Sequence, residues 1–126
     1  MSKSLNRVAI IDDDVSLCRA LGRALREVDF EAVEYHSAEA FISDLSKANF
    51  CCLLVDIQLS GMSGLEMHRR LLASGDRTPV VFMTAHNYPA LRARAIQSGC
   101  AGFFYKTDPW AKIIYAIRQA GCAAGG

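Results

Sequence analysis

Five short apolar runs, each followed by a stretch with helical spacing, narrow what this chain can fold into. The runs cover residues 8–11, 30–35, 51–55, 79–83 and 101–105. Most of them are continuous, which is typical of strands buried on both faces of a sheet, whereas 30–35 alternates weakly and indicates an edge strand. Strand and helix alternating five times predict right-handed crossovers and a parallel sheet with helices on both sides.

The stretches between the runs carry helical signals. Apolar residues recur at helical intervals over 17–28 and 110–117. Ser37 is a candidate N-cap for a short second helix that continues to Leu45. Gly99 is a candidate residue just past the end of the fourth helix.

Length and composition predict one globular domain. The 126 residues suit a single domain, and we expect a core over about 7–120 and a frayed tail at 121–126. Apolar residues make up 52% of the chain, and the net charge of +1 predicts neither a nucleic-acid nor a membrane surface. No run reaches the roughly 18–20 apolar residues of a membrane span, and residues 1–7 do not resemble a secretory signal, so we expect a cytoplasmic location.

We predict structural rather than chemical roles for the cysteines and for two of the histidines. No C-x-x-C motif occurs, and adjacent cysteines are poorly placed for an ordinary disulfide, so we expect small apolar thiols kept reduced, with a redox switch or a zinc site as the alternatives. His36 and His68 fit surface or helix positions, and no chemistry is assigned to them. The five cysteines are Cys18, Cys51, Cys52, Cys100 and Cys122.

Four of the predicted strands end in chemically distinctive residues. The first ends at Asp12 and Asp13, the third at Asp56, the fourth at Thr84, and the fifth at Lys106. Ligands of an open parallel sheet bind outside the carboxyl ends of its strands. We therefore expect these side chains to meet at one edge, although helix caps on a solvated edge are the alternative that spacing alone leaves open.

Three neighbouring carboxylates disfavour one another's charge unless a cation compensates them. Mg²⁺ prefers oxygen ligands and commonly bridges a carboxylate to a phosphate. Asp13 and Asp56 are the expected direct ligands, Asp12 a direct or water-mediated ligand, and the backbone carbonyl of Gln58 a further one.

The same edge could transfer a phosphoryl group. Asp56 could attack phosphorus as an aspartyl nucleophile. Lys106 would pair with the phosphate charge, and Thr84 would donate its hydroxyl to a phosphate oxygen.

Four segments resemble those of bacterial two-component response regulator receiver domains. They are 8–14 (acidic pocket), 53–64 (phosphoacceptor segment), 79–86 (switch threonine) and 99–106 (lysine segment), and the match covers about 7–120. The resemblance is greatest to receivers of nitrogen-fixation and nitrate-response regulators. It implies a flavodoxin-like, doubly wound (βα)5 fold with five parallel strands in the order 2-1-3-4-5, so that 1–126 forms a single receiver domain.

The resemblance also implies a signalling role rather than an enzyme's. A histidine kinase or phosphotransfer protein would phosphorylate Asp56 with Mg²⁺ present, and the domain could assist its own phosphorylation and dephosphorylation. Thr84 would then move inward and Phe103 would change rotamer, although Phe103 could equally be a packing residue. Gln58 and His86 occupy positions that tune phosphate lifetime. The face of the fourth helix, last strand and fifth helix would alter its partner contacts, including a possible homodimer.

Two positions depart from the family. Ser60 stands where proline usually follows the phosphoacceptor by four residues, and Thr107 replaces the proline that usually follows the lysine through a cis bond. A cis bond before a non-proline residue costs about 2.5–4 kcal/mol. We therefore predict a trans Lys106–Thr107 bond.

Three other functions compete with the phosphoacceptor. A degenerate receiver would act as a phosphorylation-independent binding scaffold. A phosphohydrolase with an aspartyl nucleophile would need a carboxylate where Gln58 stands, and a flavin or nucleotide binder would need a glycine-rich loop after the first strand. The chain shows no DNA-reading module, so a stand-alone receiver and the receiver of a longer transcriptional regulator both fit.

Overall fold

A computed structural model describes residues 5–44 and 49–123. Strands and helices alternate along the whole of this part of the chain, as the apolar runs predict. The elements are β1 (Arg7–Ile11), α1 (Val15–Glu27), β2 (Glu31–Tyr35), α2 (Ala38–Ser43), β3 (Cys52–Asp56), α3 (Gly64–Ala73), β4 (Val80–Thr84), α4 (Pro89–Gln97), β5 (Gly102–Tyr105) and α5 (Trp110–Gln119).

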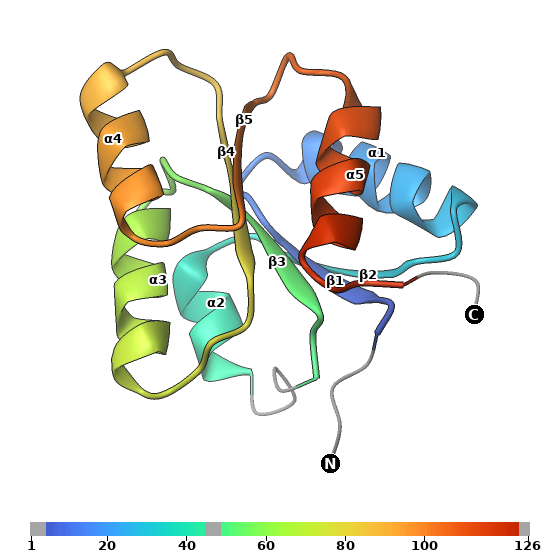
Figure 1. The fold of residues 1–126 in the computed structure, drawn as a ribbon, viewed down its shortest axis with the longest axis horizontal. Helices are drawn as coiled ribbons and strands as arrows, with labels where there is room; N and C mark the ends of the chain where they lie inside the picture. The colour runs from blue at the N-terminus through green and yellow to red at the C-terminus, as the bar shows by residue number, and fades with distance from the viewer. Residues whose placement is uncertain (1–4, 45–48, 124–126) are drawn as a thin grey trace.

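The five strands form one parallel sheet in the order β2-β1-β3-β4-β5, which confirms the predicted fold. Helices α1 and α5 cover one face, and α2, α3 and α4 cover the other (Figure 1). Strands β1, β3 and β4 lie inside the sheet and are almost wholly buried, whereas β2 lies at an edge, as its weak alternation indicates.

Two apolar cores result, one on each face of the sheet. Leu21, Leu25 and Ile117 belong to the core beneath α1 and α5. Phe41 and Met67 belong to the core beneath α2, α3 and α4. Successive strand residues point to opposite faces, which explains why continuous apolar runs feed both cores.

The helix boundaries follow local hydrogen bonding. Ser37 caps α2, because its side chain accepts a hydrogen bond from the Ala40 N–H, as predicted. Gly99 has φ +80° just past the end of α4, which also agrees with the prediction. Helix α2 ends at Ser43 and its C-cap Asp44 is extended, so the expected continuation through Asp44 is wrong, and Leu45 itself lies outside the described residues. No helix in the described ranges is long and apolar enough to cross a bilayer.

The end of the chain differs from the prediction. Cys51 and Cys122 form a disulfide, so the expectation of five reduced cysteines is wrong for this pair. The pairing was not visible because the two residues are 71 positions apart. The expected fraying is wrong for residues 121–123, since Cys122 is buried and the Ala123 N–H donates to the Leu5 carbonyl. Residues 124–126 lie outside the described part.

Candidate functional site

Three carboxylates and one ammonium group meet at the carboxyl edge of the sheet. Carboxylate oxygens of Asp12, Asp13 and Asp56 lie within 4.8 Å of one another. The Lys106 Nζ lies 2.8 Å from Asp12 Oδ2 and 2.9 Å from Asp56 Oδ2. The parallel topology thus brings together four of the residues predicted to share this edge.

Asp56 is the last residue of β3 and is only 4% exposed. Its Oδ1 accepts a hydrogen bond from the Gln58 N–H (2.9 Å), and its Oδ2 accepts one from Lys106. Burial raises the pKa of Asp56, and Asp12 adds to this, while hydrogen bonds from Lys106 and Gln58 oppose it. The two hydrogen bonds therefore hold the Asp56 carboxylate in place, while its burial costs solvation free energy.

The first turn of α3 packs directly against the backbone of Asp56. A Cβ at Gly64 would lie 2.4 Å from the Asp56 carbonyl oxygen, a distance that a side chain cannot adopt. The Gly64 N–H also donates to the Ile57 carbonyl. Gly64, the first residue of α3, thus fixes the loop after β3 close to the backbone of Asp56.

Asp12 is completely buried at the end of β1. Its Oδ1 accepts a hydrogen bond from the Asp14 N–H, whereas its Oδ2 has no hydrogen-bond partner within the described ranges and only the ion pair with Lys106. One ammonium group therefore faces three carboxylates, of which two are buried.

Asp13 is exposed and turns toward the loop after β3. Its Oδ2 accepts hydrogen bonds from the Ser60 N–H (3.3 Å) and the Ser60 Oγ (3.1 Å). Proline at position 60 could supply neither donor. The departure at Ser60 therefore orients a predicted metal ligand, a role that sequence reasoning missed.

The Lys106–Thr107 peptide bond is trans, as predicted. The turn that follows β5 is closed by Asp108, whose Oδ2 accepts a hydrogen bond from the Tyr105 N–H and whose N–H donates to the Tyr105 carbonyl. The Lys106 N–H also donates to the Thr84 carbonyl. These contacts let Lys106 reach both buried carboxylates without a cis bond.

Lys106 is held in its charged form. Burial opposes the charge, but the interactions with the carboxylates of Asp12 and Asp56 together outweigh burial and raise the pKa of Lys106. The ammonium group is thus a fixed positive charge beside the Asp56 carboxylate.

Thr84 lies at the end of β4 and is 1% exposed. Its hydroxyl donates to the His86 carbonyl (3.3 Å) and accepts a hydrogen bond from the His86 N–H (3.2 Å). Thr84 therefore interacts with its own loop in this structure. The side chain of His86 is exposed, and its ring centroid lies 5.5 Å from that of Tyr88.

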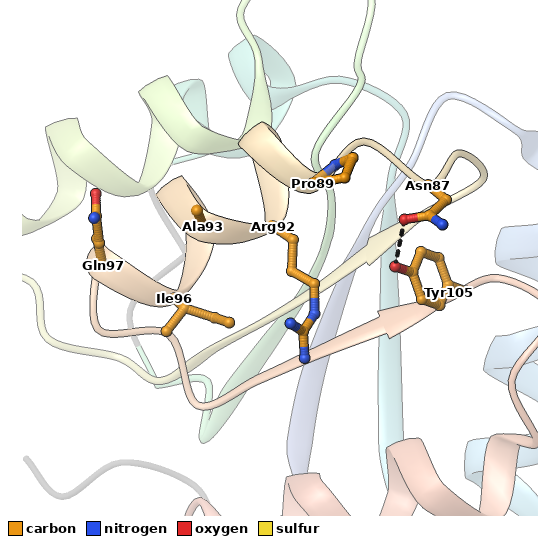
Figure 2. Close-up of a pocket in the computed structure, with 7 residues that line it drawn as sticks. All are labelled: Asn87, Pro89, Arg92, Ala93, Ile96, Gln97 and Tyr105. Atoms are coloured by element: carbon orange, nitrogen blue, oxygen red, sulfur yellow. Dashed lines mark hydrogen bonds between the residues drawn. The ribbon is translucent and has the colours of Figure 1, made fainter.

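Phe103 lies on β5, half-buried against the core beneath α4. Its ring meets Tyr105 edge-on at 5.7 Å between centroids, and the guanidinium of Arg92 lies 5.9 Å from it. Both interpretations of Phe103 remain consistent with this position. A hollow beside α4 lies between Arg92 and Tyr105, whose hydroxyl donates to Asn87 Oδ1 (Figure 2). It belongs to the predicted partner face rather than to the acidic cluster.

The acidic cluster fits a hard divalent cation. All of its donors are carboxylate oxygens, their summed charge exceeds that of Lys106, and the buried Asp12 Oδ2 has no hydrogen bond within the described part. Mg²⁺ favours oxygen donors and keeps several waters, so an edge with one exposed ligand, Asp13, suits it. Asp12, Asp13 and Asp56 are the residues that would hold it.

Comparisons with known proteins agree with this arrangement. A family profile described as the response regulator receiver domain matches residues 8–118. Response regulator protein TodT of Pseudomonas putida is 30% identical over 95% of this chain and 53% of its own length. Transcriptional regulatory protein FixJ of Bradyrhizobium diazoefficiens is 31% identical over 93% of this chain and 59% of its own. The chain therefore spans a little over half the length of these curated relatives.

Solved structures give the same result. The response regulator StyR superposes with a TM-score of 0.85 at 32% identity, covering 95% of this chain and 60% of that one. The structure called FixJ-N superposes with a TM-score of 0.84 at 28% identity and covers 96% of this chain and 95% of that one.

Proposed function

The chain belongs to the response regulator receiver domain family, and on that premise we propose that it is a phosphorylation switch whose acceptor is Asp56. The observation that carries the proposal is the position of the Asp56 carboxylate, 2.9 Å from the Lys106 ammonium and within 4.8 Å of two further aspartates at the carboxyl edge of the sheet. A buried carboxylate with a fixed ammonium beside it is poised for attack on phosphorus.

Transfer to Asp56 requires mainly positioning and charge neutralisation. A carboxylate oxygen of Asp56 forms the new bond to phosphorus, and the electron pair of the broken bond leaves with the donor. Lys106, already 2.9 Å from Asp56 Oδ2, neutralises charge on the arriving phosphoryl oxygens. Mg²⁺, held by Asp12, Asp13, Asp56 and the Gln58 carbonyl, would supply further neutralisation when bound.

The phosphodonor would be a histidine kinase or a phosphotransfer protein. The support is the likeness to response regulators such as TodT and FixJ over nearly the whole of this chain. The domain itself contributes the arrangement of Asp56 and Lys106, and could therefore assist its own phosphorylation and dephosphorylation. The exposed residues Gln58 and His86, two positions after Asp56 and Thr84, would set the access of attacking water.

Phosphorylation would be read out on the face made by α4, β5 and α5. The Thr84 hydroxyl would exchange its bond to the His86 carbonyl for a phosphate oxygen, which changes the loop leading into α4. Phe103, half-buried beside α4, is placed to repack in response. A partner protein or a second copy of the chain would bind the altered face.

Intact-mass measurement after incubation with Mg²⁺ and acetyl phosphate tests the proposal. The wild-type chain should gain the mass of one phosphoryl group, and the gain should vanish with a chelator or in Asp56→Asn. Asp14→Asn, which alters an exposed neighbour of the cluster, is the matched control and should still gain the mass. A folded wild-type chain that gains no mass would instead identify a phosphorylation-independent scaffold.

A further inference from the structure

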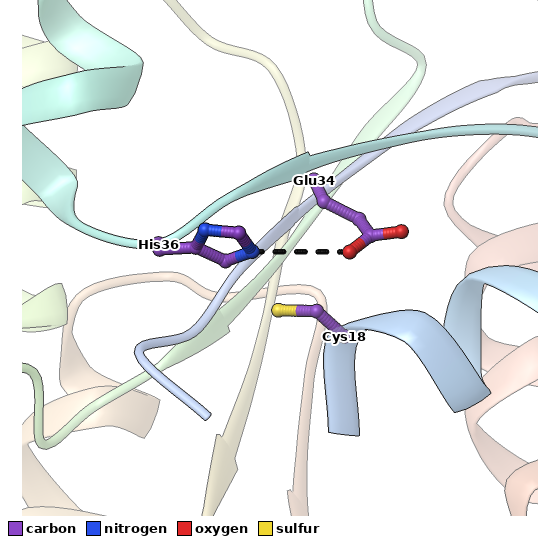
Figure 3. Close-up of side chains that lie close together, drawn as sticks. All are labelled: Cys18, Glu34 and His36. Atoms are coloured by element: carbon purple, nitrogen blue, oxygen red, sulfur yellow. Dashed lines mark ion pairs between the residues drawn. The ribbon is translucent and has the colours of Figure 1, made fainter. Parts of the chain in front are cut away.

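A second group of side chains of the kinds that ligate metals lies near the same edge of the sheet and has no part in the proposed phosphorylation. The Cys18 Sγ, a carboxylate oxygen of Glu34 and a ring nitrogen of His36 all lie within 4.8 Å of one another. Figure 3 shows the three side chains converging from α1, from β2 and from the segment just after β2. We propose that Cys18, Glu34 and His36 form a zinc site.

The fold explains how residues so far apart converge. Glu34 and His36 are two positions apart at the end of β2, so both side chains extend to the same side. Cys18 and Gly22 are one helical turn apart and face β2 from α1. A Cβ at Gly22 would come within 3.4 Å of Glu34 Oε2, so the glycine leaves room for the carboxylate beside the helix.

The donor set selects the metal. Sulfur, imidazole nitrogen and carboxylate oxygen together are typical of Zn²⁺, and three protein ligands leave the fourth tetrahedral position for water. Mg²⁺ prefers oxygen donors and is not expected at a thiolate. Zinc–ligand bonds of about 2.0–2.3 Å require donors roughly 3.3–3.8 Å apart. The His36 Nε2 to Glu34 Oε1 distance is already 3.8 Å, so small side-chain rotations suffice.

The charges around the cluster favour a cation. The Cys18 thiol is buried and donates a hydrogen bond to the Asp12 carbonyl (3.2 Å). Burial, followed by the negative charges of Asp12, Glu34 and Asp14, raises the pKa of this thiol to about 12. Those negative charges disfavour a thiolate when no metal is present, but they attract a divalent cation. A bound cation would in turn stabilise the Cys18 thiolate.

Binding can be written with a full proton balance. The Cys18 thiol proton passes to solvent, and its hydrogen bond to the Asp12 carbonyl is broken. Bonds then form from zinc to the thiolate sulfur, to the neutral imidazole of His36 and to Glu34 Oε1. Arg26 lies 3.8 Å from the other Glu34 oxygen, Oε2, and can retain it. The His36 side chain is 48% exposed, so the ion can enter from the solvent side.

Titration of the full chain with cobalt(II) chloride tests the site, because cobalt substitutes for zinc and reports sulfur ligation through a sulfur-to-metal charge-transfer absorption. An oxygen-only pocket such as the acidic cluster cannot produce that band. The wild-type chain should show it, equimolar Zn²⁺ should abolish it, and excess Mg²⁺ should not. Asp56→Asn should retain it, so the outcome is independent of the proposed phosphorylation.

Variants identify the ligands. Cys18→Ser should lose the band, and His36→Gln and Glu34→Gln should each weaken cobalt binding by at least about tenfold. Cys100→Ser, which removes a different free thiol, should retain both band and affinity. The His36 side chain is half exposed, so its variant does not endanger the fold. Absence of the band, its persistence in Cys18→Ser, or unchanged affinity in both His36→Gln and Glu34→Gln would overturn the proposal.

Discussion

The amino edge of the sheet, where its parallel strands begin, and the carboxyl edge, where they end, contain different kinds of side chains. At the amino edge, Phe30 and Phe50 are buried beneath the guanidinium groups of Arg118 and Arg7, and a disulfide joins Cys51 to the end of the chain. At the carboxyl edge, Asp12, Asp56 and Lys106 are buried or nearly so.

The difference separates stability from function. The amino edge is held by packing, cation–π contacts and a covalent bond, all of which stabilise the fold. The carboxyl edge keeps negative charge on Asp12, Asp13 and Asp56 that Lys106 does not fully compensate, which costs solvation free energy and suits the edge to bind a cation. Substitutions at the two edges should therefore affect different properties.

The largest expected effect lies at the amino edge. Replacing Cys51 and Cys122 by alanine frees a loop of 71 residues and should lower the free energy of unfolding by about 4 kcal/mol. Urea unfolding measures the change, with Cys100→Ser as a control. Phosphorylation by acetyl phosphate should be unaffected under folding conditions. A loss of phosphorylation in the folded double variant would contradict the view that the amino edge determines stability and the carboxyl edge function.

The next effect lies at the carboxyl edge. Lys106→Met leaves Asp12 and Asp56 facing each other without their cation, which should cost up to about 3 kcal/mol in the absence of metal. Mg²⁺ should restore most of that loss, because the ion replaces the missing charge. Thermal unfolding with and without Mg²⁺ measures both. Equal losses of stability with and without Mg²⁺ would show that Lys106 acts by packing alone. Lys112→Met, at an exposed lysine, is the control.

Helix α3 carries a buried histidine, His68, which offers a pH test that avoids both edges of the sheet. His68 is buried against Phe82, its Nδ1 has no hydrogen-bond partner in the described ranges, and burial lowers its pKa. The unfolded chain therefore binds a proton near pH 6.5 while the folded chain binds it only at lower pH. Stability should fall as pH decreases through 6.5, with a slope of at most about 1.4 kcal/mol per pH unit.

Urea unfolding across pH 5–8 (roughly the range over which histidine titrates) measures that slope. His68→Leu should remove its contribution, and the exposed His36→Gln should retain it. A pH dependence identical in the wild type and His68→Leu would assign it to other groups.

The smallest effect concerns Ser60. Ser60→Ala removes the hydroxyl that donates to Asp13 Oδ2 but leaves the backbone N–H in place. Mg²⁺ affinity should fall by a few-fold, at the low end of what outer-sphere contacts contribute, because Asp13 is exposed. Calorimetric titration measures it, with the exposed Ser43→Ala as a control. Tighter binding in Ser60→Ala would mean that the serine competes with the metal.

Much of this molecule could be predicted from its sequence because strand burial and strand ends are local signals. The strands, their order and the meeting of Asp12, Asp13, Asp56 and Lys106 follow from apolar periodicity, resemblance and parallel topology. Contacts between distant segments that neither a strand end nor a family motif marks did not follow. Examples are the Cys51–Cys122 bond, the clustering of His36 with Cys18, and Ser60 on Asp13.

The sequence identifies the positions that depart from the family, but it does not predict the structural consequences of those departures. Sequence identified Thr107 as the position where the loop must change, and a trans bond was predicted. That Asp108 would close the turn and preserve the reach of Lys106 depends on the three-dimensional path of the turn, which no spacing rule specifies.

The position of the phosphoryl group on the chain tests the central claim most directly. The wild-type chain is incubated with Mg²⁺ and acetyl phosphate, reduced with borohydride, which converts an aspartyl phosphate to homoserine, and sequenced by mass spectrometry. We predict homoserine at position 56 and at no other aspartate. Homoserine at Asp12 or Asp13, or an unmodified folded chain, would contradict the assignment of Asp56 as the phosphoacceptor.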